Sequence, residues 1–71
     1  PPDLAPRLSI LYSNRAMCAK ALSAWVDMEA DARSAIATDK LNPKAHYLLG
    51  LCLCRALSWV EGVRELEARL E

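Results

Sequence analysis

The feature that most constrains this chain is an internal repeat with a period of 34 residues. Trp25 and Trp59 lie 34 positions apart in the sequence. The same offset aligns further residues of matching type, namely Cys18 with Cys52, Val26 with Val60, Asp27 with Glu61 and Asp31 with Glu65. A period of roughly 20–50 residues is typical of proteins that stack copies of one small structural unit. The 71 residues have room for two such units.

The composition indicates that each unit is helical. Hydrophobic residues make up 54% of the chain, but 12 of them are alanines and only 6% of all residues are aromatic. Alanine favours helices, whereas sheets are enriched in β-branched and aromatic side chains. We therefore expect an all-α fold.

The first unit is predicted to contain two helices, over residues 7–22 and 25–38. Apolar residues recur at steps of three and four in both segments, as on the buried face of a helix. They are Leu8, Leu11, Tyr12, Ala16, Ala19 and Leu22 in the first segment and Trp25, Met28, Ala32, Ala35 and Ile36 in the second. Pro1 and Pro2 indicate a non-helical start, and Pro6 is compatible with a first helical turn. Ser23 and Ala24 form a short break.

The second unit is predicted to contain helices over residues 43–57 and 59–71. Asn42 is a favourable N-cap residue and Pro43 a favourable first helical residue. Ser58 and Glu61 match the capping box that begins many helices, so a second helix is expected to start here. Its buried face is expected to consist of Trp59, Val63, Leu66 and Leu70. The sequence thus predicts four helices in two antiparallel hairpins, over residues 9–42 and 43–71, the second incomplete at its C-terminal end.

Charge and cysteine content exclude several functional classes. Nine basic residues balance nine acidic ones, so the chain lacks the basic surface expected of a nucleic-acid-binding protein. It has no long apolar run and no basic-then-apolar leader, so we expect neither a membrane partner nor a signal peptide. Three cysteines without a secretory signal predict free thiols in the cytoplasm. The chain begins with Pro1 rather than Met, so we expect a segment of a longer protein.

Two short motifs resemble a known family. They are YSNRA at residues 12–16 and KAHYLLG at residues 44–50. Together they are similar to the tetratricopeptide repeats of co-chaperones, and most of all to those of the chaperone-linked U-box ubiquitin ligases of the CHIP family. The resemblance implies a short right-handed solenoid that binds the acidic C-terminal peptide of seventy- and ninety-kilodalton heat-shock chaperones. The first repeat of that family and its U-box have no counterpart here, so the chain itself is expected to be non-catalytic and to need no cofactor.

The resemblance also implies a peptide-binding site. In the family, Lys and Asn side chains hold the terminal carboxylate of the peptide, and Asn14 and Lys44 match two of these positions. Leu48 occupies a position that is basic in many relatives but apolar in CHIP-like ones, and Tyr47 is expected to line an apolar pocket. Independently, stacked helices present Ser13 and Met17 on the same face as Asn14. A carboxylate accepts hydrogen bonds from both an ammonium and an amide, which fits this residue set.

Other interpretations of these residues stay open. Asn14 could bond the backbone of the neighbouring repeat, Lys44 could be solvated, and Tyr47, Leu48 and Leu51 could pack against another helix. A zinc site at Cys52 and Cys54 is excluded, because residues two apart on a helix point about 200° apart. Alternative functions are a generic repeat scaffold for an unrelated protein partner and a fragment that self-associates. The two tryptophans are expected to anchor the stack, although an unfinished solenoid could leave one of them partly exposed.

Overall fold

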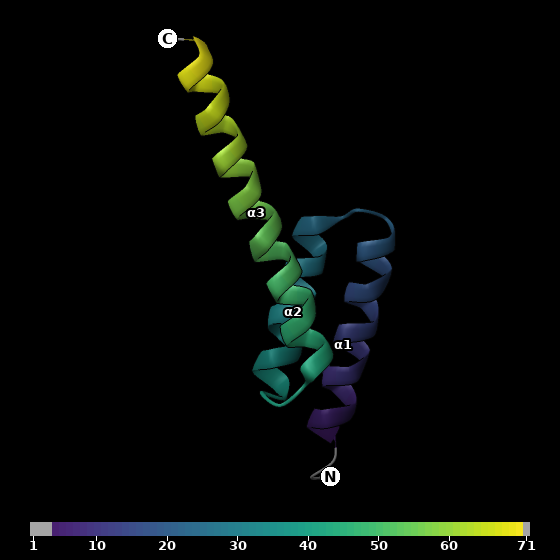
Figure 1. Cartoon of the computed structure of the whole chain (residues 1–71). Helices are drawn as coiled ribbons and strands as arrows, with labels where there is room; N and C mark the ends of the chain where they lie inside the picture. Colours follow the sequence, from purple (N-terminus) through teal and green to yellow (C-terminus); the bar gives the residue numbers. More distant parts are fainter. Residues whose placement is uncertain (1–3, 71) are drawn as a thin grey trace.

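Three helices make up the described part of the chain, in which no strand occurs. The structure is a computed structural model that describes residues 4–70, with side chains up to residue 69. Helix α1 spans Leu4–Ala21, α2 spans Trp25–Thr38 and α3 spans Pro43–Leu70 (Figure 1). The all-α prediction is confirmed, and the bounds of α2 are those predicted from the sequence. The predicted start at Pro1 and Pro2 lies outside the described residues. None of the described helices is long and apolar enough to cross a membrane.

The turn between α1 and α2 depends on a left-handed residue at Ser23. Its φ is 57°, a conformation that favours glycine. The backbone N–H of Ala24 donates to the carbonyl of Ala19 at 2.8 Å, and that of Ser23 donates to Lys20 at 3.0 Å. This pair of bonds is the Schellman motif, which satisfies the last carbonyl groups of a helix. It reverses the chain within three residues, so that α2 packs against α1.

A buried polar network fixes the start of α3. The Asn42 side-chain oxygen accepts the backbone N–H of Ala45 at 3.1 Å, which confirms Asn42 as the N-cap. Its amide nitrogen donates to the hydroxyl groups of Ser9 at 2.9 Å and Ser13 at 3.3 Å. Ser9 in turn donates to the carbonyl of Ala35 at 2.7 Å. Asn42 thus links α1 to α3, and Ser9 extends the network to α2.

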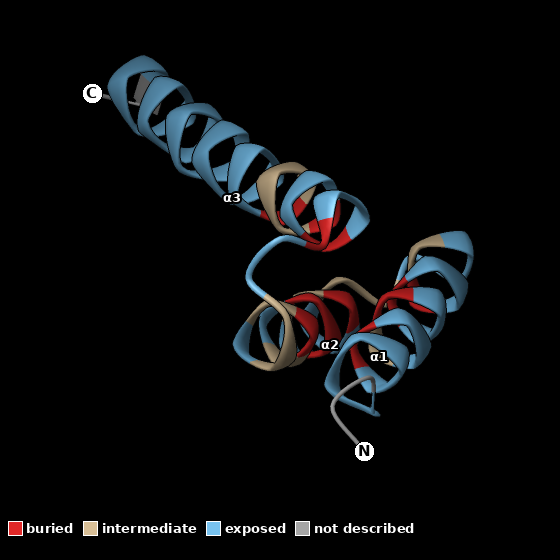
Figure 2. Cartoon of the chain, turned by 90° about the horizontal axis from the view of Figure 1, so that it is seen from below, coloured by how far each residue is buried: buried red, intermediate tan, exposed pale blue. Residues whose placement is uncertain are grey.

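The core lies where the first half of α3 crosses α1 and α2. Figure 2 shows the buried residues on the facing sides of the three helices. The residues that pack together are Ala16, Ala19, Met28, Ala32, Leu48 and Cys52. Three of these six are alanines, and small side chains allow helices to approach closely. Trp25 is half-buried beside this cluster, so it is an anchor as predicted, with the Arg55 guanidinium 4.3 Å from the centre of its ring.

The predicted hairpin within the second unit is wrong. Helix α3 continues through Ser58 without a break, so the described residues form three helices instead of four. The 34-residue offset shows which residue of α3 corresponds to the turn between α1 and α2. It aligns Leu57 with Ser23, the residue that adopts the left-handed conformation in the first turn. A bulky leucine in that conformation costs roughly 1–2 kcal/mol, and Ser58 tolerates a helix interior, so the helix continues.

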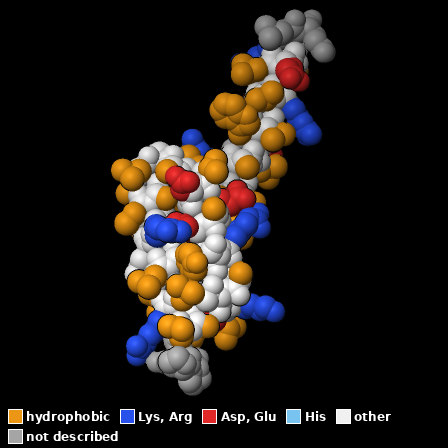
Figure 3. Space-filling view, turned by 180° about the vertical axis from the view of Figure 1, so that it is seen from behind, with side chains coloured by type: hydrophobic (Ala, Val, Ile, Leu, Met, Phe, Trp, Pro, Cys, Tyr) orange, Lys and Arg blue, Asp and Glu red, His pale blue; other side chains and the backbone are white. Residues whose placement is uncertain are grey.

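The second half of α3 is consequently uncovered. It projects from the three-helix body, and hydrophobic side chains remain visible along it (Figures 1 and 3). Trp59 is 74% exposed, Leu66 is 61% exposed and Val63 is 37% exposed. The prediction that these residues form a buried face is therefore wrong, and Trp59 is the tryptophan that the unfinished stack leaves exposed. The predicted role of Leu70 concerns a side chain outside the described set.

Candidate functional site

Asn14 and Lys44 meet on the surface between α1 and α3. The Lys44 ammonium donates a hydrogen bond to the Asn14 side-chain oxygen at 3.3 Å, and both residues are exposed. Asn14 lies in the middle of α1, and Lys44 lies in the first turn of α3, next to the cap formed by Asn42. The cap therefore determines where the backbone of Lys44 lies, and residues 30 positions apart in sequence become neighbours.

Asn14 and Lys44 together offer the hydrogen-bond donors and the positive charge that an anion requires. No carboxylate of the described residues pairs with Lys44. The Asn14 oxygen accepts from Lys44, so the amide N–H groups are the donors that Asn14 can offer to a ligand. An ammonium and an amide N–H can donate to the two oxygens of one carboxylate.

Three more side chains extend this surface along the two helices. Tyr47 follows Lys44 by one helical turn and is 57% exposed, whereas Met17 follows Asn14 by one turn and is 39% exposed. The Lys20 ammonium lies 5.7 Å from the centre of the Tyr47 ring, within range of a cation–π contact. We call the surface formed by Asn14, Met17, Lys20, Lys44 and Tyr47 the α1–α3 face. Lys20 was missed from the sequence, although its three-residue spacing after Met17 places it on this side of α1.

Two predicted site residues lie in the core instead. Leu48 is 0% exposed and packs within the hydrophobic cluster. Ser13 is 2% exposed, and its hydroxyl donates to the carbonyl of Ile10 at 3.0 Å and accepts from Asn42. Both side chains are thus buried between helices, apart from the exposed side chains of Asn14 and Lys44. The sequence did not predict their burial, because both residues lie on the side of their helix that a neighbouring helix covers.

Arg15, next to Asn14, forms an ion pair with Asp31 of α2. Its guanidinium donates to both carboxylate oxygens of Asp31 on α2, at 2.8 and 2.7 Å. The hydrogen bond to Asp31, and then the charge of that carboxylate, raise the pKa of Arg15. Since this bidentate pair already engages Arg15, the cations that face a ligand on the α1–α3 face are Lys44 and Lys20.

The three thiols differ in environment, so they should differ in reactivity. Cys18 and Cys54 are exposed and Cys52 is buried, and burial raises the pKa of the Cys52 thiol. The thiolate is the reactive form, so a raised pKa and a covered sulfur both slow alkylation. We expect iodoacetamide at mildly alkaline pH to modify Cys18 and Cys54 at least about tenfold faster than Cys52. Peptide mapping by mass spectrometry measures the three rates.

Urea provides the control for this experiment, since unfolding should make the three rates similar. Fast alkylation of Cys52 in the folded chain would contradict the packing of α3 on α2.

The described residues also contain no cluster of three His, Cys, Asp or Glu side chains able to share a metal ion.

Comparison with known proteins finds relatives of this chain. The E3 ubiquitin-protein ligase CHIP of Arabidopsis thaliana is 37% identical to this chain over 68 residues, which is 96% of the chain. The chain is thus similar to a segment of CHIP. That segment is 24% of the length of the ligase, so the chain spans about a quarter of its relative. The similarity supports the CHIP-like repeat region inferred from residues 12–16 and 44–50. No protein-family model matches the chain, and no solved structure matches it significantly.

Proposed function

We propose that this chain is a cytoplasmic tetratricopeptide-type module that binds the C-terminal peptide of a heat-shock chaperone. Asn14 and Lys44 hold the terminal carboxylate, and Tyr47 and Met17 contact the apolar part of the peptide. By analogy with CHIP, the module recruits a chaperone with its client to a ubiquitin ligase. The chain contributes recruitment in this proposal, and no catalytic step.

The observation that carries the proposal is the 3.3 Å contact between Lys44 and Asn14 on an exposed face without a paired carboxylate. The similarity to CHIP independently favours a partner of the chaperone class. Two donors on separate helices are also more selective than one, because a ligand must match their spacing.

The proposal predicts that binding depends on a free carboxylate. The chain is titrated with a fluorescent peptide that ends in Glu-Glu-Val-Asp and with the same peptide as a C-terminal carboxamide. We expect the free acid to bind about tenfold to a hundredfold more tightly, because a charge-assisted hydrogen bond contributes roughly 1.5–3 kcal/mol. Lys44→Ala should remove most of this preference, and Asn14→Ala part of it.

Lys40→Ala is the matched control, since Lys40 is an exposed lysine in the turn between α2 and α3. It should leave the preference for the free acid unchanged. Equal binding of acid and carboxamide would reject the carboxylate site and favour a generic scaffold. A mass that rises with concentration and does not respond to Lys44→Ala would favour self-association through the uncovered half of α3.

A further inference from the structure

We infer that the second half of α3, residues 59–70, pairs with the same segment of a second copy of this chain. The two segments lie antiparallel and pack through Trp59, Val63 and Leu66, which we call the α3 stripe. The inference does not rest on the proposed function, because the α1–α3 face lies on α1 and on the first turns of α3. Pairing and peptide binding therefore do not exclude each other, and a dimer carries two α1–α3 faces.

The α3 stripe continues the buried face of the first half of α3. In the first half, Ala45 and Cys52 are buried and Leu49 packs against the core cluster. In the second half, the same face is exposed. Alternating steps of four and three residues, the heptad pattern of helices that pair, connect all members of this face. They are Ala45, Leu49, Cys52, Ala56, Trp59, Val63 and Leu66.

The cover of this face ends where α2 begins. The Cys52 thiol donates to the carbonyl of Trp25, the first residue of α2, at 3.9 Å. Next to this contact, a groove of about 460 Å³ opens between α2 and α3, and Val26, Ala56 and Trp59 are among its lining residues. A partner helix on the α3 stripe therefore extends the cover that α2 provides, and its end reaches this groove.

The position of α1 and α2 selects the antiparallel direction. Both helices pack at one end of α3, on the side that the α3 stripe continues (Figure 2). In a parallel pair, the two three-helix bodies would meet at the same end and on the facing sides of the two α3 helices, where they would overlap. In an antiparallel pair, the bodies lie at opposite ends, so the two stripes can meet.

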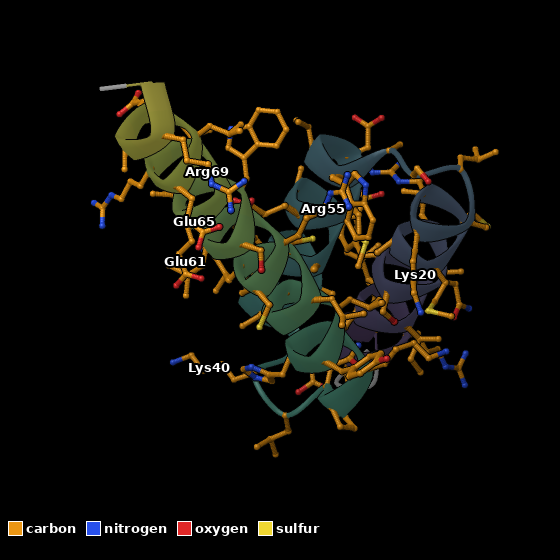
Figure 4. All side chains as sticks on the ribbon, turned by 45° about the horizontal axis from the view of Figure 1, so that its top comes forward. Lys20, Lys40, Arg55, Glu61, Glu65 and Arg69 are labelled. Atoms are coloured by element: carbon orange, nitrogen blue, oxygen red, sulfur yellow. The ribbon has the colours of Figure 1, made fainter. Side chains whose placement is uncertain are left out.

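The charges of the second half of α3 favour the same direction. With Val63 of one copy opposite Leu66 of the other, Arg69 lies nearly level with Glu61 of the other copy. A parallel pair would instead bring each Glu61 and each Glu65 level with its own counterpart, and charges that flank a helix pair influence its orientation. Figure 4 shows Glu61 and Glu65 on the side of α3 away from α2, so these carboxylates stay outside the interface.

The length of the segment sets the strength of pairing. An isolated helix shorter than about 12–15 residues is marginal in water, so residues 59–70 gain stability from a partner helix. Two such short helices bury less than the roughly 1,200 Å² at which standard stable interfaces begin. We therefore expect a weak dimer with a Kd on the order of 10–100 µM.

Sedimentation equilibrium between about 10 µM and 1 mM tests the pairing. The average mass should rise from the 7.9 kDa of one chain toward twice that value. Val63→Glu should weaken association at least about tenfold, because it places a charge in the apolar interface. Ala68→Glu is the matched control, since it adds the same charge to the same half of α3 at an exposed position away from the α3 stripe. It should change the Kd by less than about twofold.

A mixing experiment tests the direction of the two helices. Val63→Glu in one chain and Leu66→Lys in another should each prevent pairing, and an equimolar mixture should restore it. The antiparallel arrangement places the new carboxylate opposite the new ammonium, whereas a parallel one does not. A mixture that stays monomeric overturns the antiparallel arrangement.

Two results overturn the pairing itself. The first is the mass of a single chain at every concentration, which would leave the α3 stripe to a protein of different sequence. The second is an equal loss of association in Ala68→Glu and Val63→Glu. The preference for free-acid over carboxamide peptides decides the proposed function whatever the mass of the chain, so the two proposals fail separately.

Discussion

Replacing Asn42 by Ala should destabilise the chain by about 2–3 kcal/mol, the sum of a lost N-cap and lost buried hydrogen bonds. Asn42 is 8% exposed and bonds to the backbone of Ala45 and to the hydroxyl groups of Ser9 and Ser13. Its removal leaves the Ala45 N–H without an acceptor and loosens α3 from α1. A core of this size supplies only about 3–5 kcal/mol of net stability, so the substitution would remove a large part of the free energy of unfolding.

Urea unfolding followed by far-ultraviolet circular dichroism measures this loss, and Asn14→Ala is the matched control. Asn14 is also an asparagine on a helical segment next to α3, but it is exposed and its bond to Lys44 lies at the surface. We expect its replacement to change stability by less than about 0.5 kcal/mol. Equal effects of the two substitutions would show that the polar network does not hold the helices together.

The sequence predicted those parts of the fold that depend on local signals. Asn42 followed by Pro43 is a strong N-terminal signal, and α3 begins there. The short break at Ser23 and Ala24 was also predicted, and the chain turns there. The pairing of Asn14 with Lys44 was predicted through a resemblance, not from spacing alone. Nothing local specifies that two residues 30 positions apart meet across a helix interface.

The wrong predictions have two physical causes, one local and one in the packing of the helices. The Ser58 capping box is a local signal, but a hairpin also needs a residue that tolerates the left-handed conformation, and Leu57 does not supply one. Whether a residue such as Leu48 faces a ligand or a neighbouring helix depends on how the helices cross, which periodicity does not encode. Lys20 was overlooked for the same reason, because its proximity to Tyr47 depends on the packing of α3 beside α1.

Leu48 gives the clearest test of that packing, because its two interpretations predict different results. In the core, Leu48→Ala should destabilise the chain by about 2–5 kcal/mol, as expected for a buried leucine that leaves a cavity. Leu53 lies on the same helix and is 49% exposed, so Leu53→Ala should cost about 1 kcal/mol or less. Urea unfolding of both variants compares the two costs.

Peptide binding provides the second half of this test. If Leu48 acts only from the core, its replacement weakens binding only by unfolding a fraction of the chains. Affinity per folded chain, measured in a stabilising osmolyte such as sucrose, should then match that of the unchanged protein. If instead Leu48→Ala left stability unchanged and weakened binding, Leu48 would have to line the peptide site. Helix α3 would then be rotated relative to α1, and the contacts of Lys44 with Asn14 and of Lys20 with Tyr47 would have to be reassigned together, since one helix orientation determines all three.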